Sequence, residues 1–410
     1  MKKLFAFLRS KAFVFGAAAL FLLFFSNDFG MIDIQKTSIV TAIGIDAAAE
    51  EDLVDVTAQI AVPDETGKKA SNVAVKGAAT VGEAIAEFNQ KTGWYPTLVH
   101  CRLILLGEDT AKRNVFEVLD FFLRSQFVED SCLIAVCEGR ADEALQAKSP
   151  VGDLTFSAIE KVLSSEAQKT GLVSVTSLRE FAIGYYSKSG SGFLPYLSVR
   201  QEATDGTAGG SSSPAAQQEG GASGGADGGP GGGSGGNEAD VFDASRTMLF
   251  SAGKAGELLT PEETLAFNLA EAKTDFAYGD VKVTENGKEV TYNLKMKIKK
   301  KSAAVRPEGG VPVLTFRIRA KAQAADANTA AARDEIVQTA FVPEHVLRAA
   351  EEKLRSELES VLKKCAACGC DLFGVRRSIR KKYPGAYEEI KDKVPAGIVA
   401  AFDIRFDTLR

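Results

Sequence analysis

The sequence predicts a multidomain α+β protein in which mixed and antiparallel sheets pack against helices. Several segments alternate apolar and polar residues, which is typical of strands with one buried face. Other segments carry an apolar stripe at helical spacing and open with a capping residue. Strands and helices follow one another without a regular β–α repeat, which favours a mixed sheet over a doubly wound one. The length of 410 residues allows about two or three domains.

The composition is that of an ordinary globular protein and disfavours several classes of function. The net charge of −5 argues against a general affinity for nucleic acid. The only two histidines are His100 and His345, which disfavours histidine-rich metal sites and histidine-dependent catalysis. Six cysteines are too few for a disulfide framework in a chain of this length. No phosphate loop, nucleophile elbow or zinc-protease motif occurs, and no cofactor is predicted.

Residues 1–27 have the pattern of a signal sequence or a membrane anchor. Residues 1–11 are basic and residues 12–25 are entirely apolar, so the rest of the chain is expected on the extracytoplasmic side. The apolar run is shorter than the roughly 20 residues of a full span. No A-x-A cleavage site follows it, however, and no cysteine lies between Phe25 and Cys101 to accept a lipid. We predict an uncleaved membrane anchor helix, with a cleaved signal and a buried helix as alternatives.

An N-terminal α+β region is predicted over residues 31–200, either as one unit or as subdomains 31–148 and 149–200. Thr80 and Glu83 have the spacing of a capping box, which begins a helix that Gly93 ends. Strands are expected at residues 38–45, 53–62, 73–76, 98–106 and 132–136. A helix capped by Asp109 is expected to run to residue 123, and a short helix to cover 141–147.

The second part of this region is expected to contain helices at 153–169 and 176–186 and a strand at 193–199. Pro195 lacks a backbone N–H, so we expect that strand at the edge of its sheet. Residues 203–240 hold 14 of the 38 glycines and nothing to bury, which predicts a disordered insertion. The strands on either side could pair, so we expect a long loop rather than a hinge between independent domains.

A C-terminal α+β domain is predicted over residues 241–410. It begins with a strand at 241–250 and a helix with a Thr260 cap and Pro261 in its first turn. Alternation in 292–298 and 314–322 indicates a long antiparallel hairpin with one apolar and one basic face. The elements expected after it are a long helix from Pro343 whose apolar stripe reaches Cys365, a helical segment at 371–383 and a strand at 398–406.

The basic face of this hairpin is the candidate docking surface. Its four basic side chains are Lys295, Lys297, Arg317 and Arg319. The register that keeps both apolar sets on one side places Lys297 near Arg317. It likewise places Lys295 near Arg319. Opposed like charges destabilise a strand pair, so a surface selected only for stability would more often mix the signs. We predict docking to an acidic partner subunit or to anionic lipid head groups. The alternative is that Asp403 and Asp407 of the last predicted strand lie alongside the basic face and neutralise it.

The cysteines Cys365, Cys368 and Cys370 raise a second functional hypothesis, an extracytoplasmic thiol- or metal-dependent enzyme. Cys365 and Cys368 continue the apolar stripe of the long helix, however, and no histidine lies nearby to complete a tetrahedral site. We therefore expect buried structural cysteines, no metal and no catalysis. Glu108 and Asp109 are expected to serve the start of a helix rather than chemistry.

Four segments, in the same order, resemble parts of the Ger(x)C family of spore germination proteins. The family's first strand is similar to DIQKTSIVTAIGID, residues 33–46. Its strand, Gly-Glu turn and following helix are similar to HCRLILLGEDTAKRNVFEVLDFFLR, residues 100–124. The start of its C-terminal domain resembles VFDASRTMLFSAGKAGELLTPEET, residues 241–264. Its closing helix and Lys-Tyr-Pro step resemble DLFGVRRSIRKKYPGAYEEIK, residues 371–391.

The resemblance implies the C subunit of a germinant receptor, a multidomain α+β protein without known enzymatic activity outside the spore inner membrane. The implied partners are two membrane-protein subunits of the same receptor, and whether the chain itself binds a small-molecule germinant stays open. The sequence departs from the family in three places. The lipid-bearing cysteine expected near Ser26 and Asn27 is missing, and the glycine-rich insertion is unusual. The tryptophan usual after the Tyr-Pro step is also absent, although Tyr387 stands close by.

Overall fold

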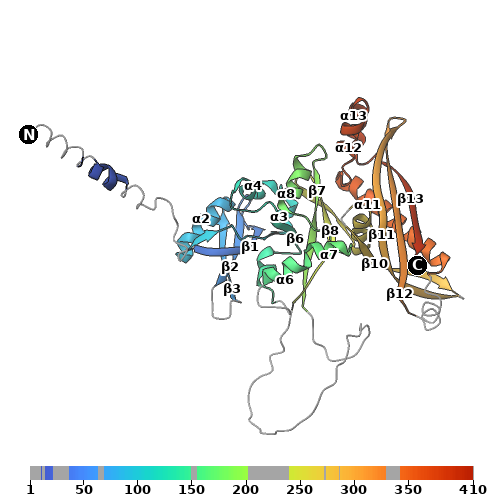
Figure 1. Cartoon of the computed structure of the whole chain (residues 1–410), viewed down its shortest axis with the longest axis horizontal. Helices are drawn as coiled ribbons and strands as arrows, with labels where there is room; N and C mark the ends of the chain where they lie inside the picture. Colours follow the sequence, from blue (N-terminus) through green and yellow to red (C-terminus); the bar gives the residue numbers. More distant parts are fainter. Residues whose placement is uncertain are drawn as a thin grey trace, which may run out of the picture.

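The structure is a computed structural model that describes residue 11 and residues 14–21, 37–62, 69–148, 155–201, 240–271, 274–285, 287–328 and 342–409. The described chain forms two β-sheets, one of nine strands and one of four, with helices packed against both. Figure 1 shows the nine-stranded sheet on the left and the four-stranded sheet on the right. The predicted mixed α+β fold is confirmed.

The predicted anchor, residues 1–27, lies largely outside the described residues. Residues 14–21 are helical, and their large apolar side chains are all more than 60% exposed: Val14, Phe15, Leu20 and Phe21. Of the helices that the structure describes, none combines the length and the apolarity needed to cross a membrane.

The first sheet mixes parallel and antiparallel strands, as predicted. Its strands are β1 (Thr37–Ala47), β2 (Val54–Val62), β3 (Lys69–Ala78), β4 (Tyr95–Thr97), β5 (Leu103–Gly107), β6 (Leu133–Cys137), β7 (Ser191–Gln201), β8 (Asp240–Ser251) and β9 (Lys254–Leu259). Their order is β3-β2-β1-β5-β6-β7-β8-β9, and β4 pairs with the beginning of β1. The central neighbours β1, β5, β6 and β7 run parallel, and the outer pairs are antiparallel.

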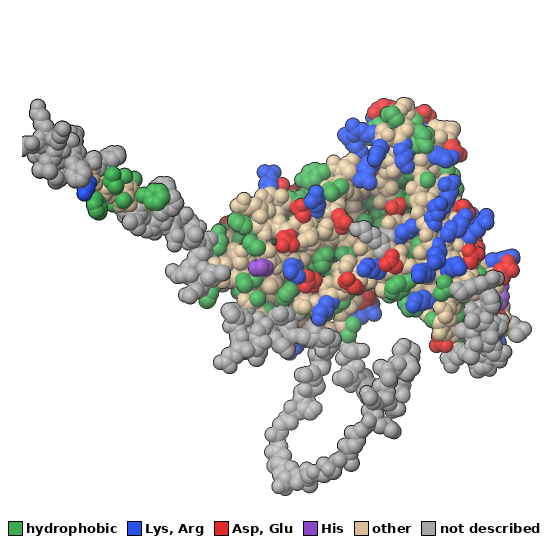
Figure 2. Space-filling view, in the orientation of Figure 1, with side chains coloured by type: hydrophobic (Ala, Val, Ile, Leu, Met, Phe, Trp, Pro, Cys, Tyr) green, Lys and Arg blue, Asp and Glu red, His purple; other side chains and the backbone are tan. Residues whose placement is uncertain are grey.

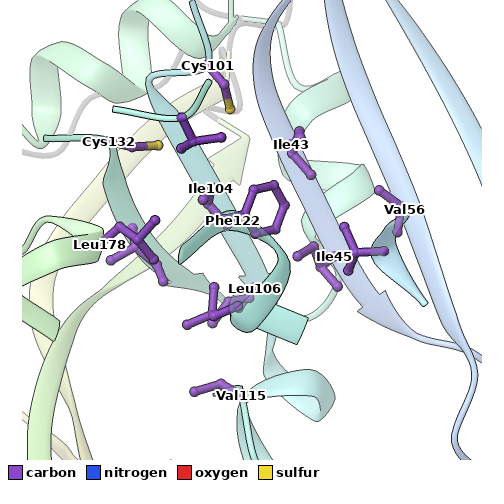
Figure 3. Packing of buried hydrophobic residues seen from close by; sticks show 14 of the residues in the cluster. Ile43, Ile45, Val56, Cys101, Ile104, Leu106, Val115, Phe122, Cys132 and Leu178 are labelled. Carbon is purple, nitrogen blue, oxygen red and sulfur yellow. The ribbon is translucent and has the colours of Figure 1, made fainter. Parts of the chain in front are cut away.

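Helices cover both faces of this sheet. They are α2 (Val81–Thr92), α3 (Glu108–Lys112), α4 (Phe116–Arg124), α5 (Ala141–Gln146), α6 (Thr155–Val162), α7 (Ser165–Lys169) and α8 (Leu178–Tyr186). Figure 3 shows Phe122 of α4 packed among Ile43 and Ile45 of β1 and Ile104 of β5, and all four side chains are fully buried. A second cluster buries the opposite face against α5 and α6. All five residues of β5 are therefore buried, which explains its uninterrupted apolar run.

Two predicted helices are each broken in two. The helix expected from Asp109 to residue 123 consists of α3 and α4, because Asn114 accepts a hydrogen bond from the Phe116 N–H and turns the chain between them. The cap of α3 is Gly107, so the assignment of Asp109 as a cap is wrong. The helix expected at 153–169 likewise divides into α6 and α7, and Ser164 caps α7.

The prediction that Pro195 places its strand at an edge is wrong. β7 lies between β6 and β8. β6 pairs with β7 only at Val136↔Tyr196 and Cys137↔Leu197, so that pairing begins one residue after the proline. The missing N–H of Pro195 is tolerated because no β6 residue is paired with it.

The strands on either side of the glycine-rich segment are partners, as predicted. β7 pairs antiparallel with β8 from Ser191↔Ser251 to Gln201↔Asp240. The Asp240 N–H also donates to the Lys148 carbonyl, and the Lys148 N–H donates to the Asp240 carboxylate at 2.7 Å. The predicted insertion at 203–240 lies outside the described residues apart from Asp240. β8 and β9 complete the first sheet, so this sheet continues into the region predicted to form the C-terminal domain.

The second sheet carries the predicted hairpin. Its strands, in spatial order, are β10 (Phe276–Glu285), β11 (Lys288–Glu308), β12 (Val311–Ala327) and β13 (Val399–Thr408). The helices packed with it are α9 (Pro261–Ala270), α11 (Glu344–Cys368), α12 (Val375–Lys382) and α13 (Pro384–Ile390). The Thr260 cap, the position of Pro261 and the apolar stripe of α11 are as predicted, and Glu263 completes a capping box with Thr260. Alternation along β11 and β12 buries one face and leaves the basic face outside.

The register predicted for the hairpin is wrong. Lys297 pairs with Lys321 rather than with Arg317, and Lys295 pairs with Gln323 rather than with Arg319. The strands extend beyond the predicted segments 292–298 and 314–322 to a two-residue turn at Gly309 and Gly310, both with positive φ. A β-bulge between Ile298 and Lys300 shifts the pairing further.

A small apolar cluster joins the two sheets. It contains Leu249 of β8, Leu259 of β9 and Phe267 of α9, which pack against the C-terminal end of α11. The α11 side of the cluster is formed by Val361 and Cys365, with Cys370 just beyond the helix.

Candidate functional site

The predicted docking surface lies on the outer face of β11 and β12. Lys295, Lys297 and Arg317 are exposed and Arg319 is half-buried. All four point to one face because they alternate with buried residues along both strands. Figure 2 shows basic side chains interspersed with acidic ones over this part of the molecule.

Arg319 is already engaged by the last strand. β13 lies parallel to β12, and Asp403 accepts two hydrogen bonds from one guanidinium nitrogen of Arg319, each at 2.8 Å. The other terminal nitrogen of Arg319 donates to the Asp403 carbonyl at 2.7 Å. These hydrogen bonds from Arg319 hold the pKa of Asp403 below its usual range. Neutralisation by the last strand, the alternative considered from the sequence, therefore occurs at Arg319. The register also sets Asp403 beside Arg317 and Asp407 beside Lys321, although neither pair comes within 4.0 Å among the described residues.

Lys295 has a different environment from the other three. Its ammonium group lies 5.4 Å from the centre of the Phe276 ring and 5.6 Å from the centre of the Tyr278 ring, both on β10. This is cation–π geometry, which positions the charge without neutralising it.

The rest of the face remains positively charged. Lys297 faces Lys321 across the hairpin, and Lys300 faces Arg319. The pairs predicted from the sequence, Lys297 with Arg317 and Lys295 with Arg319, are therefore wrong, but other pairs of like charge do face each other across β11 and β12. In the described part of the chain, Lys297, Lys300 and Arg317 form no ion pair within 4.0 Å. This face can attract an acidic surface electrostatically, but it holds no group that suggests catalysis.

The cysteine cluster is part of the core that joins the two sheets. Cys365 and Cys370 are buried and Cys368 is half-buried. A hydrogen bond with Cys370 and then burial raise the pKa of the Cys368 thiol, and a hydrogen bond with Cys365 raises the pKa of Cys370. A protonated thiol is a poor nucleophile and a poor metal ligand. Among the residues that the structure describes, no three His, Cys, Asp or Glu side chains are arranged to hold a metal ion.

The carboxylates of Glu108 and Asp109 lie in the first turn of α3. Lys112 forms ion pairs with both, at 3.4 Å to Glu108 and 2.9 Å to Asp109. Glu108 also accepts a hydrogen bond from the Tyr196 hydroxyl at 3.1 Å. Burial and then the Glu108 charge raise the pKa of Tyr196. The arrangement stabilises the helix start and ties it to β7, in keeping with the prediction.

Sequence reasoning missed a pocket of about 470 Å³ at the junction of the two sheets. Its wall comes from α8, β7, α9 and the segment before α12, and includes Phe193, Phe267 and Arg377. Thr176 also lines it, and its buried hydroxyl has no hydrogen-bond partner among the residues that the structure describes. No local motif indicates this pocket, because its residues come together only when both halves of the chain have folded.

Comparisons with known proteins agree with the resemblance seen in the sequence. The family model described as "Spore germination protein N-terminal domain" matches residues 30–199. The model described as "Spore germination B3/ GerAC like, C-terminal" matches residues 245–407. A solved structure entitled "Crystal Structure of the GerBC protein" is similar at 16% identity and a TM-score of 0.45, and the match covers 92% of this chain and 100% of that one. No curated protein matches the chain. With its N-terminal and C-terminal regions both matched in order, the chain belongs to the Ger(x)C family of spore germination proteins.

Proposed function

We propose that this protein is the C subunit of a germinant receptor, tethered to the outer face of the spore inner membrane and acting through protein–protein contacts without catalysis. The observation that supports this most is the match of both family models, which together extend over residues 30–199 and 245–407. The partners are the membrane-protein subunits of the same receptor.

The membrane tether is the uncleaved N-terminal segment. Residues 14–21 are helical and contain no polar side chain, and their large apolar side chains are exposed to more than 60%. Exposed apolar area costs about 25 cal/mol per Å², so such a helix favours an apolar environment. The basic residues before it favour a cytoplasmic N-terminus.

The docking surface comprises Lys295, Lys297, Arg317 and Arg319, with Arg319 in a supporting role because Asp403 holds it. Lys297 and Arg317, which form no ion pair among the described residues, lie on paired strands, so their backbone needs little reordering on binding. An acidic surface of a receptor subunit is the occupant that we propose. Anionic lipid is the alternative occupant.

The docking proposal is tested by replacing Lys295, Lys297 and Arg317 with glutamine in the full chain. Arg319 is left in place, since removing it would leave Asp403 without its partner. We expect co-purification with the membrane subunits to fall about tenfold, equivalent to about 1.4 kcal/mol. Germination in response to the cognate germinant should slow in spores that carry this variant.

The matched control replaces Lys161, Lys188 and Lys254 with glutamine. These lysines lie outside the second sheet, are exposed and form no ion pair among the described residues, and their replacement likewise removes three positive charges. The control should behave as the unmodified chain. Equal effects from both variants would show that only net charge matters. A loss of binding to anionic vesicles with unchanged co-purification would identify lipid as the occupant.

A further inference from the structure

A patch of exposed apolar side chains lies where the body of the chain begins, at one end of the first sheet. We define the tip as five residues that are each at least 40% exposed: Ile39, Trp94, Tyr95, Val99 and Phe127. They are five of the eleven large apolar side chains that are exposed on the described residues after 36. Such clustering at one end indicates a surface that is covered in the working protein.

The tip is held together by the start of the sheet. β4 pairs in parallel with the first residues of β1, so Tyr95 lies beside Thr37 and Thr97 beside Ile39. Trp94 immediately precedes β4. Tyr95, Phe127 and Thr37 also line one groove of about 1190 Å³, which runs between α2 and α4. Ile39 and Tyr95 thus lie in strands, Trp94 and Val99 lie in the turns on either side of β4, and Phe127 lies in the turn after α4; the patch continues into this groove.

The tip itself is uncharged, although Glu117, Asp120 and Arg124 line the groove beside it and Glu129 and Asp130 follow Phe127 closely. Residues 93–99 include no charged side chain, and neither do residues 125–127. Arg124, the nearest cation lining the groove, forms an ion pair with Asp120 at 2.7 Å. Tryptophan and tyrosine are the residues most enriched where proteins meet the interfacial layer of a bilayer, because an apolar ring carries a polar N–H or O–H.

The position of the tip along the chain identifies what covers it. Eleven residues, 26–36, separate the apolar N-terminal run from Thr37. Fully extended, they span about 40 Å. When the apolar run is anchored, β1 begins within that distance of the bilayer, and the tip surrounds the beginning of β1. We propose that the tip rests in the interfacial layer of a phospholipid bilayer, an inference that depends on the proposed membrane tether.

This contact also orients the molecule. Figure 1 shows β11, β12 and β13 at the opposite end of the long axis from α2 and the start of β1. With the tip on the bilayer, the sheet that carries the basic face lies at the far end of the molecule from lipid. A protein surface then becomes its accessible partner, which agrees with the proposed docking of a receptor subunit.

The chain contains its own probe for this contact, because Trp94 is the single tryptophan. The full-length protein is reconstituted into phosphatidylcholine vesicles, either plain or with bromine atoms on the acyl chains, and vesicle flotation is measured in parallel. We expect a blue-shifted emission in plain vesicles. In brominated vesicles the emission should fall by about half or more, since interfacial groups penetrate about 5–10 Å.

Two pairs of substitutions test which surface makes the contact. Val99→Ser with Phe127→Ser removes exposed apolar area from the tip, and should weaken quenching while flotation persists. The control, Ile183→Ser with Val399→Ser, changes exposed apolar residues outside the tip, and should leave quenching unchanged.

The outcomes separate this proposal from the tether on which it depends. A chain that does not float with the vesicles overturns both. A chain that floats but keeps Trp94 unquenched, and fully accessible to acrylamide in water, retains the tether and overturns the bilayer contact. If Trp94 is shielded only when the membrane-protein subunits are present, the tip binds protein instead of lipid.

Discussion

At the scale of single residues, the clearest constraint is the close approach of Gly107 to Asp46. Asp46 is buried, and its carboxylate accepts hydrogen bonds from the Ala141 N–H at 2.7 Å and the Asp142 N–H at 3.0 Å. It thereby satisfies the first turn of α5. A Cβ atom at Gly107 would lie 2.2 Å from the Asp46 carboxylate. Glycine is required here by space, since its φ of −63° suits any residue.

Gly107→Ala should therefore displace the Asp46 carboxylate and leave two buried N–H groups unpaired. We expect a loss of about 2–3 kcal/mol in the free energy of unfolding, measured by urea denaturation. Gly385→Ala is the matched control, because a Cβ there meets nothing within 4 Å and the residue lies inside α13. The control should be neutral or more stable by up to about 1 kcal/mol. Similar losses for both variants would contradict the explanation.

At the scale of elements, the features that depend on neighbouring residues, such as helix caps and strand alternation, were predicted from the sequence. The N-terminal caps at Thr80 and Thr260 and the alternation of β11 and β12 were all visible in the sequence, although Glu83 reaches back to the Ala79 N–H and so does not close the capping box predicted at Thr80. β9 and β10 were missed. The register of the hairpin was also mispredicted, because it depends on a two-residue glycine turn and a β-bulge, and alternation alone is compatible with several registers.

The candidate docking surface likewise combines a local feature that the sequence predicted with long-range contacts that it did not. Alternation was enough to find the basic face. The ion pair between Arg319 and Asp403 depends on a strand more than eighty residues away that pairs in parallel, and no local pattern indicates it. The tip was missed for the same reason, since Phe127 joins Tyr95 only through the packing of α4 beside α2.

The pairing of β7 with β8 predicts how stability changes when the segment between the two strands is shortened. Gln201 and Asp240 are already register partners, so the sheet holds the two ends together. Replacing residues 202–239 by four glycines shortens the closed loop by about three doublings. Each doubling is worth about 0.6 kcal/mol, so stability should rise by up to about 2 kcal/mol.

Calorimetry should then give a melting temperature unchanged or higher by a few degrees. A chain with the same segment in shuffled order serves as the control and should melt like the original. A large loss of stability, or two separately melting halves, would show that the segment does more than connect the strands.

At the scale of the whole molecule, α9 and α11 connect the two sheets. The apolar cluster around Leu249, Leu259 and Phe267 is reinforced by a buried ion pair. Glu263 of α9 is 3% exposed and lies 2.7 Å from the ammonium group of Lys364 on α11. The Ser360 hydroxyl donates to the same carboxylate at 2.6 Å.

The pKa of Glu263 gives this connection a defined pH dependence. Burial tends to raise the pKa, but the hydrogen bonds from Lys364 and Ser360 outweigh it and lower the pKa below its usual range. A carboxylate whose pKa is lowered on folding stabilises the folded chain above its unfolded pKa. That contribution is lost as the pH falls through the lower, folded value.

Lys364→Met should therefore weaken the whole molecule, because it retains packing but leaves Glu263 charged, buried and without its cation. Removing one partner of a buried pair costs about 3 kcal/mol. Lys363→Met is the matched control, since Lys363 is exposed and forms no ion pair among the described residues.

Unfolding is followed by Trp94 fluorescence, which reports on the first sheet, and by far-ultraviolet circular dichroism, which reports on the whole chain. Because the ion pair and the apolar cluster bridge both sheets, both signals should shift together to lower denaturant at pH 7. The shift should shrink as the pH falls into the usual range of a glutamate pKa and below it, because Glu263 is then protonated. A circular dichroism transition that moves while the Trp94 transition stays in place would show that the two sheets unfold independently.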